Sequence, residues 1–214
     1  MPVPAVAAAF GELPRVDALV RSAAFRRALA AIEDAERERP WCRHGLAHLL
    51  DVARIAWIDA LEHGLPLSKD VVYAAALLHD IGRAAQYACG EPHDAAGSRM
   101  AAEMLDELPA ALRYAADERA CIVAAVAGHR GGDADCPRAA GVGDASAVDG
   151  AIAPCAGAVD VAAPAAAASS APTAADALAA VIRTADKASR SCWACAARAT
   201  CHWPEESMNV SIRV

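Results

Sequence analysis

The sequence predicts an all-α protein, and three observations lead to that prediction. Apolar residues recur at the spacing of an α-helix over most of the chain, and no alternating pattern typical of a β-strand is found. Alanine, the strongest helix former, is abundant: 56% of the 214 residues are hydrophobic, although only 4% are aromatic. The length suits one domain with a core of its own.

Five helices are expected before residue 130, each from its apolar face and its end signals. They run over residues 16–38, 44–63, 69–81, 93–108 and 117–129. Pro40 stops the first helix, and Ser68 is a plausible N-cap for the third. The third is apolar almost all round, which is typical of a central, buried helix. Gly82 then either ends that helix or allows another backbone to come close.

The segment over residues 131–172 has a different composition from the rest of the chain. It has no aromatic residue, and its only charges are Arg138 and five aspartates. Such a segment cannot bury enough apolar surface to offset the entropy of ordering it. We therefore expect a disordered or loosely ordered Ala/Gly-rich insertion. The chain then divides into an N-terminal helix (1–39), the first part of the domain (40–130), the insertion (131–172), and a last helix with a Cys-rich tail (173–214).

Composition also narrows the classes of partner. The net charge is −7, which argues against a nucleic-acid backbone as the main partner. No stretch is apolar enough for a membrane helix, and the N-terminus does not resemble a signal peptide. The sequence favours a cytoplasmic protein, in which the eight cysteines would be thiols or metal ligands rather than disulfides. It gives no indication of the oligomeric state.

The histidines carry the clearest chemical signal. His79 and Asp80 end the most apolar helix, where an ionisable pair is costly to bury without partners. At the angle between neighbouring helical residues, an imidazole and a carboxylate can still meet one metal ion lying between them. His48 precedes the pair by about 30 residues and Asp186 follows it by about 100, each on an expected helix with an apolar face.

This pattern resembles the HD-domain metal-dependent phosphohydrolases, whose signature is H…HD…D on an all-helical fold. The matching strings are "HLLDVARIA" at His48, "ALLHDIGR" at His79 and "IRTADKASR" at Asp186. The resemblance implies that His48, His79, Asp80 and Asp186 bind one divalent metal. It also implies hydrolysis of a phosphate ester or anhydride in a nucleotide-like or other phosphorylated small molecule. Asp80 would take part in catalysis.

Two arginine and lysine side chains are expected near the phosphate. Arg83 follows the doublet and is placed to meet a phosphate oxygen, which a guanidinium can bind through two hydrogen bonds. Lys187, next to Asp186, either supplies a nearby point charge or is an ordinary surface residue.

Further histidines bear on the number of metal ions. Some HD families resemble this chain in placing a histidine before a Gly-containing helix and another at the end of the next helix, as His93 and His129 are placed here. Two cations would clamp a phosphate and activate a bridging water. Alternatively His93 only begins a helix and His129 binds phosphate. Such ligands suit Fe, Mn, Zn or Co, and Mg is a further candidate. His44, expected on the same helix face as His48, either orients a ligand or water or contacts substrate.

The cysteines near the C-terminus form a second pattern. Cys192, Cys195 and Cys201 have the spacing of a metal knuckle, and Cys42 or His202 would supply a fourth ligand. Thiolates bind either a structural zinc ion or an iron–sulfur cluster. The alternative is that these cysteines are reduced thiols packed as small apolar residues.

Two other functions fit the same residues. The protein can be a non-catalytic sensor that binds a nucleotide or a metal and uses the cysteine site to report redox or metal state. It can also be a di-iron oxygenase of the HD type, because such enzymes resemble the hydrolases in their ligands. The full ligand set favours a hydrolase.

Overall fold

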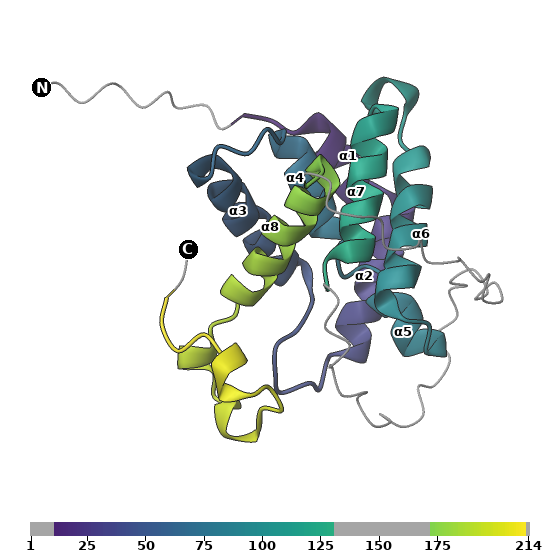
Figure 1. Cartoon of the computed structure of the whole chain (residues 1–214). Helices are drawn as coiled ribbons and strands as arrows, with labels where there is room; N and C mark the ends of the chain where they lie inside the picture. The colour runs from purple at the N-terminus through teal and green to yellow at the C-terminus, as the bar shows by residue number, and fades with distance from the viewer. Residues whose placement is uncertain (1–10, 131–171, 213–214) are drawn as a thin grey trace, which may run out of the picture.

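A computed structural model describes residues 11–130 and 172–212, and all the regular secondary structure in these residues is helical. This confirms the predicted all-α class (Figure 1). The predicted insertion over 131–172 lies outside the described residues except for its last residue. The α-helices are α1 (Pro14–Arg21), α2 (Ala23–Ala35), α3 (Leu46–Glu62), α4 (Lys69–Leu78), α5 (Arg83–Cys89), α6 (His93–Asp106), α7 (Ala116–Gly128) and α8 (Ala174–Ala188). Short 3₁₀ turns are η1 (Ala110–Leu112), η2 (Cys192–Ala194), η3 (Arg198–Thr200) and η4 (Glu205–Ser207).

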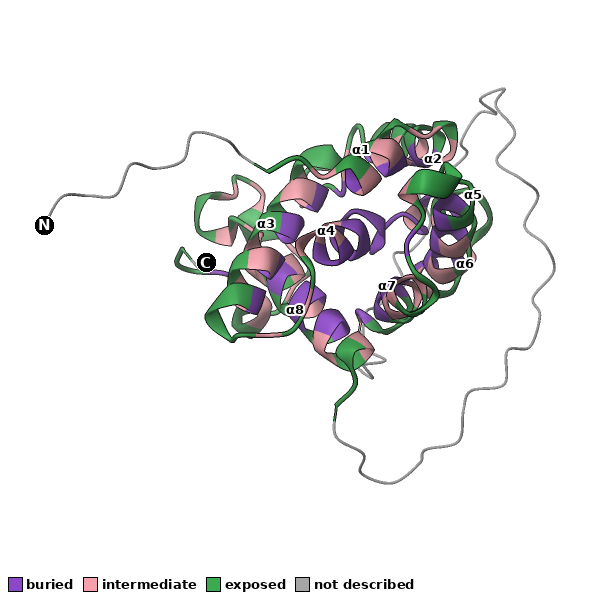
Figure 2. Ribbon diagram, turned by 90° about the horizontal axis from the view of Figure 1, so that it is seen from above, coloured by how far each residue is buried: buried purple, intermediate pink, exposed green. Residues whose placement is uncertain are grey.

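Helix α4 is the centre of the fold, as its apolar sequence predicts. Figure 2 shows it surrounded by α1, α2, α3, α7 and α8. Seven of its ten residues are buried, so its C-terminal end delivers whatever follows it into the interior. Burial of its Val and Leu side chains contributes about 1.5–3 kcal/mol each.

The expected helix over 69–81 is wrong at its end, and α5 was not expected. Helix α4 ends at Leu78, turns follow, and α5 begins at Arg83. The cause lies in α6. A Cβ atom on Gly82 would lie 2.0 Å from the His93 carbonyl oxygen and 2.3 Å from the Gly97 amide nitrogen. Gly82 is therefore needed for a close approach of two backbones, one of the two roles expected for it.

The single helix expected over 16–38 is also wrong, because the chain breaks at Ser22. This residue is extended, with ψ 147°, and its hydroxyl accepts a hydrogen bond from the Phe25 amide at 3.2 Å. A serine that caps a new helix competes with continuation of the old one. Both pieces bury apolar residues, including Leu19 and Ile32, in the same core as the other helices.

His44 and His48 do not share a helix, contrary to the expectation. Helix α3 begins after Gly45, and the backbone N–H of His44 donates to the Glu36 carboxylate at 2.6 Å. Ser68 occupies the N-cap position of α4 but makes no side-chain capping bond. The expected helices over 93–108 and 117–129 are confirmed to within two residues at each end, and the expected last helix is confirmed as α8. Over the described ranges, no helix has the length and apolar character needed to cross a bilayer.

Candidate metal centre

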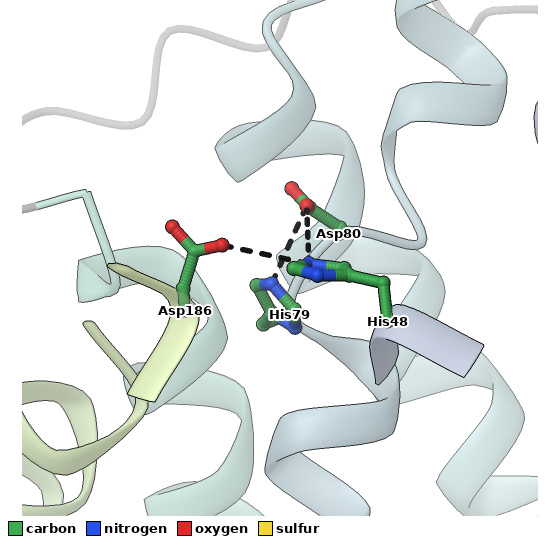
Figure 3. Close-up of side chains that lie close together, drawn as sticks. All are labelled: His48, His79, Asp80 and Asp186. Carbon is green, nitrogen blue, oxygen red and sulfur yellow. Dashed lines mark ion pairs between the residues drawn. The ribbon is translucent and has the colours of Figure 1, made fainter. Parts of the chain in front are cut away.

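Four side chains from three parts of the fold converge beside the end of α4. His48 comes from α3, His79 and Asp80 from the turn after α4, and Asp186 from α8 (Figure 3). The Asp80 Oδ2 atom lies 3.3 Å from Nε2 of His79 and 3.8 Å from Nε2 of His48. Nε2 of His48 lies 3.4 Å from Oδ1 of Asp186. One donor atom from each residue falls within 4.8 Å of the others, which is close enough for all four to bind one ion.

A second group of donors shares Asp80 with the first. His93 at the start of α6 and His129 at the end of α7 direct their Nε2 atoms toward Asp80 Oδ1, at 3.6 and 3.9 Å. All three side chains are buried. The two oxygens of Asp80 thus face two separate sets of ligands, so this carboxylate can bridge two cations. We call the six residues of both groups the histidine–aspartate centre.

Hydrogen bonds on the far side of three of the four rings, those of His48, His79 and His129, fix which nitrogen faces the centre. Nδ1 of His79 donates to the Ala76 carbonyl, and Nδ1 of His129 donates to the Val126 carbonyl, each at 2.6 Å. The Ser189 hydroxyl donates to the Asp186 carbonyl at 2.7 Å and lies 3.3 Å from Nδ1 of His48, from which it accepts. With Nδ1 protonated, Nε2 of these three rings in their neutral form presents a lone pair to Asp80.

This arrangement fits a bound cation. Nε2 of His48 and Nε2 of His79 are buried and have no hydrogen-bond partner. The nitrogen lone pairs repel the carboxylate oxygens that they face. Burying such atoms without hydrogen-bond partners also costs free energy. A divalent cation between them would remove both penalties, and nitrogen with carboxylate oxygen is a donor set suited to Fe, Mn, Zn or Co.

The local electrostatics keep His48, His93 and Asp80 in the form that binds metal. Burial, and then the charge of His79, lower the pKa of His48 to about 4. Burial and the charge of Arg83 lower the pKa of His93 to about 3. Burial alone would raise the pKa of Asp80, but Arg83 and His79 hold it well below its usual range. Near neutral pH His48 and His93 are therefore neutral imidazoles and Asp80 is an ionised carboxylate, whereas the neighbouring carboxylate raises the pKa of His79 despite its burial.

His44 lies at the edge of the centre and is held by a residue that the sequence reading missed. Its Nδ1 donates to Glu36 at 2.6 Å, and its Nε2 lies 3.8 Å from Asp80 Oδ2. Glu36 is only 2% exposed, and the Tyr87 hydroxyl also donates to it. Burial would raise the pKa of Glu36, but the hydrogen bond from His44 lowers it to about 2. A signal was present, because Glu36 continues the apolar face of α2 four residues after Ile32.

The positively charged residues are placed differently from one another. Nε of Arg83 lies 2.8 Å from Asp80 Oδ1, so its charge is directed at the ligand. Lys187 is exposed. Arg190, which the sequence reading did not single out, pairs with Asp186 at 2.8 Å. A phosphate contact from Arg83 or Lys187 remains a prediction.

The cysteines singled out in the sequence lie apart from this centre. Cys42, Cys192, Cys195 and Cys201 are half-buried free thiols. The structure brings the segment of Cys42 against the tail that carries the other three, since Nε1 of Trp41 donates to the Thr200 carbonyl at 3.1 Å.

An all-helical fold around a buried histidine–aspartate centre is the arrangement that the H…HD…D resemblance implies, and comparison with known proteins agrees. The family model of the HD domain matches residues 45–190. The chain belongs to the HD domain family. It is also 40% identical, over 95 residues, to a protein of Clostridium beijerinckii (strain ATCC 51743 / NCIMB 8052) described as an uncharacterized protein. That match covers 44% of this chain and 58% of the relative. No solved structure matches the chain.

Proposed function

We propose that the protein is a metal-dependent hydrolase that cleaves a phosphate ester or anhydride of a nucleotide-like or other phosphorylated small molecule. The observation that carries the proposal is the position of Asp80. Its two oxygens face two sets of histidine nitrogens, and two of these nitrogens, Nε2 of His48 and Nε2 of His79, are buried without a hydrogen-bond partner. Membership in the HD domain family supports the same class of reaction.

Each group of donors would hold one ion. His48, His79, Asp80 and Asp186 form the first site, and Asp80, His93 and His129 form the second. Divalent cations bound there would neutralise phosphate oxygens and lower the pKa of a coordinated water, so that water attacks phosphorus near neutral pH.

The side chains around the ligands would prepare the site for that chemistry. Arg83 keeps Asp80 ionised from one side. Glu36 accepts the Nδ1–H of His44, and Nε2 of the same ring points toward Asp80. A neutral imidazole in that position can accept a proton from the attacking water and return it to the leaving oxygen.

A substrate panel tests the proposal. Protein loaded with Mn or Fe would be incubated with nucleoside mono-, di- and triphosphates, dinucleoside polyphosphates and sugar phosphates, and released phosphate or nucleotide would be measured. We expect turnover of at least one class, loss of turnover on chelation, and recovery when the metal is restored. The Asp80→Ala variant should show neither turnover nor metal at this centre, and His93→Ala should lose one of two ions.

Other results would overturn the proposal. If Asp80→Ala kept its metal content and its activity, the assignment of the site would be wrong. Tight nucleotide binding without turnover would indicate a sensor, and turnover that requires dioxygen would indicate an oxygenase.

A further inference from the structure

The tail after α8 is folded around thiols instead of aliphatic side chains. Over residues 191–203 the chain runs through η2 and η3, and most side chains are exposed. The side chains that are not exposed are Cys192, Cys195, Ala197, Cys201 and Trp203. Small segments without an aliphatic core need disulfides or a metal to hold one conformation. None of these three cysteines is in a disulfide.

A fourth cysteine approaches from a distant part of the sequence. Trp41 bonds to the Thr200 carbonyl, and its ring meets the edge of His202 with 5.5 Å between ring centroids. Cys42 and Cys201 are the chain neighbours of the residues in this contact. This contact places the segment of Cys42 against the part of the tail that carries Cys201.

We propose that Cys42, Cys192, Cys195 and Cys201 hold a second metal centre, ligated by four thiolates and separate from the histidine–aspartate centre. The C-x₂-C spacing of Cys192 and Cys195 is that of a metal knuckle. The amide of Cys195 donates to the Cys192 carbonyl at 3.3 Å, which gives the pair the tight turn that two ligands of one centre need. His202 is exposed and packs against tryptophan rings, which leaves Cys42 as the fourth ligand.

The spacing of the sulfurs favours an iron–sulfur cluster over a single zinc ion. Among the described residues, the donor groups that lie within 4.8 Å of one another belong to the histidine–aspartate centre, and the cysteines do not form such a group. Four thiolates on one zinc ion at about 2.3 Å lie close together. In a cubane cluster each thiolate binds a different iron atom, so the four sulfurs lie further apart.

The thiolate centre would position part of the histidine–aspartate centre. Arg190 bridges the two, because it pairs with Asp186 at 2.8 Å and its guanidinium lies 4.4 Å from the centroid of the Trp203 ring. On the other side, Cys42 lies two residues before His44. A metal that ties these two segments together would fix the end of α8 against the start of α3 (Figure 1).

Metal and sulfide analysis of the whole chain tests the proposal. The wild type, Cys195→Ser and Asp80→Ala would be purified without oxygen, together with Cys121→Ser as a control. Cys121 is another half-buried free thiol, on α7. We expect about four iron and four acid-labile sulfide per wild-type chain beyond the metal that Asp80→Ala removes. Cys195→Ser should lose all of this fraction, while Cys121→Ser and Asp80→Ala should keep it.

The alternatives give different results. One zinc per chain without sulfide, lost in Cys195→Ser and kept in Cys121→Ser, supports a four-thiolate centre with zinc as its occupant. If the wild type contains neither after reconstitution with iron and sulfide or with zinc, there is no such centre. Equal loss in Cys195→Ser and Cys121→Ser would also overturn the proposal. Since Asp80→Ala removes only the other metal, failure here is distinguishable from failure of the proposed hydrolase.

Discussion

The histidine–aspartate centre and the tail over residues 191–209 are held in place by different means. The ligands of the centre project from the ends or the inner faces of helices whose apolar residues form the core, and four of them are buried. The tail consists of short 3₁₀ turns, and its only buried residues are Met208 and Asn209. Packing can therefore preorganise the first region without metal, whereas the second needs specific bonds.

The largest effect is expected from Asp80→Ala, which should remove metal from the histidine–aspartate centre and leave the metal of the tail in place. Asp80→Ala removes the one carboxylate that both groups of the centre share. Loss of several kcal/mol of transition-state stabilisation corresponds to a decrease of about 1000-fold in kcat/KM. The tail should keep its metal, and the far-ultraviolet circular dichroism should be unchanged. A variant that lost metal from both regions would show that they are not independent.

The next effect tests whether packing alone builds the centre. In Gly82→Ala the new methyl would overlap backbone atoms of His93 and Gly97, which cannot turn aside. We expect the free energy of unfolding to fall by about 3 kcal/mol or more, measured by urea denaturation with chelator present.

Gly97→Ala is the matched control for this substitution. Its nearest neighbour would be the Val126 side chain at 3.3 Å, which can shift. The gain in helix propensity of about 1 kcal/mol offsets the crowding, so little change is expected. Equal costs for the two variants would contradict the close approach of α5 and α6.

The dependence of stability on pH tests the same region without metal. The native pKa values of His48 and His93 are about 4 and about 3, against about 6.5 in an unfolded chain. Between these values the unfolded chain binds more protons, so the free energy of unfolding falls as the pH is lowered from 6.5 to 4.

The raised pKa of His79 opposes part of this loss, and we expect a net decrease of about 2–3 kcal/mol. It would be measured by urea denaturation of chelated protein at pH 7 and pH 4.5. His93→Asn should lose less than the wild type over this interval. If the free energy of unfolding were the same at pH 7 and pH 4.5, the imidazoles would be free to turn toward solvent.

A smaller effect is expected from the residues behind His44. Glu36→Gln keeps the shape but removes the charge that holds the Nδ1–H of His44. Loss of such a supporting bond typically costs about 10–100-fold in activity. Tyr87→Phe removes one hydrogen bond to Glu36 and leaves the bond to His44, so it should cost only a few-fold. If the two variants lost the same activity, Glu36 would not act through His44.

The sequence predicts the parts of the molecule that depend on local pattern. Helix α4 and the doublet after it are recognisable because ionisable residues end an otherwise apolar helix. His93 and His129 stand at predicted helix ends, and the structure does bring both beside Asp80. The family resemblance assigned the remaining ligands.

The features that were missed depend on contacts between segments far apart in sequence. Helix α5 begins at Arg83 because Gly82 meets the backbone of α6. Glu36 continues the apolar face of α2, but the sequence does not show that His44 and Tyr87 bond to it. Asn209 has no pattern around it, although it closes the end of α8. Periodicity carries no information about such partners.

The smallest expected effect asks whether metal alone holds the tail. Nδ2 of the buried Asn209 donates to three carbonyls, those of Lys187, Ala188 and Arg190, at 2.5, 3.0 and 2.9 Å. Two of them, those of Lys187 and Ala188, lie in the last turn of α8, where the regular hydrogen bonds of the helix end. Asn209→Ala should therefore lower the free energy of unfolding by about 1–2 kcal/mol. Asn209→Asp should cost more, because it directs a carboxylate at the same carbonyls.

If Asn209→Ala were as stable as the wild type while keeping its thiolate-bound metal, the cysteines alone would hold the tail. A loss of stability in metal-free protein would instead show that Asn209 ties the tail to α8 before any metal binds.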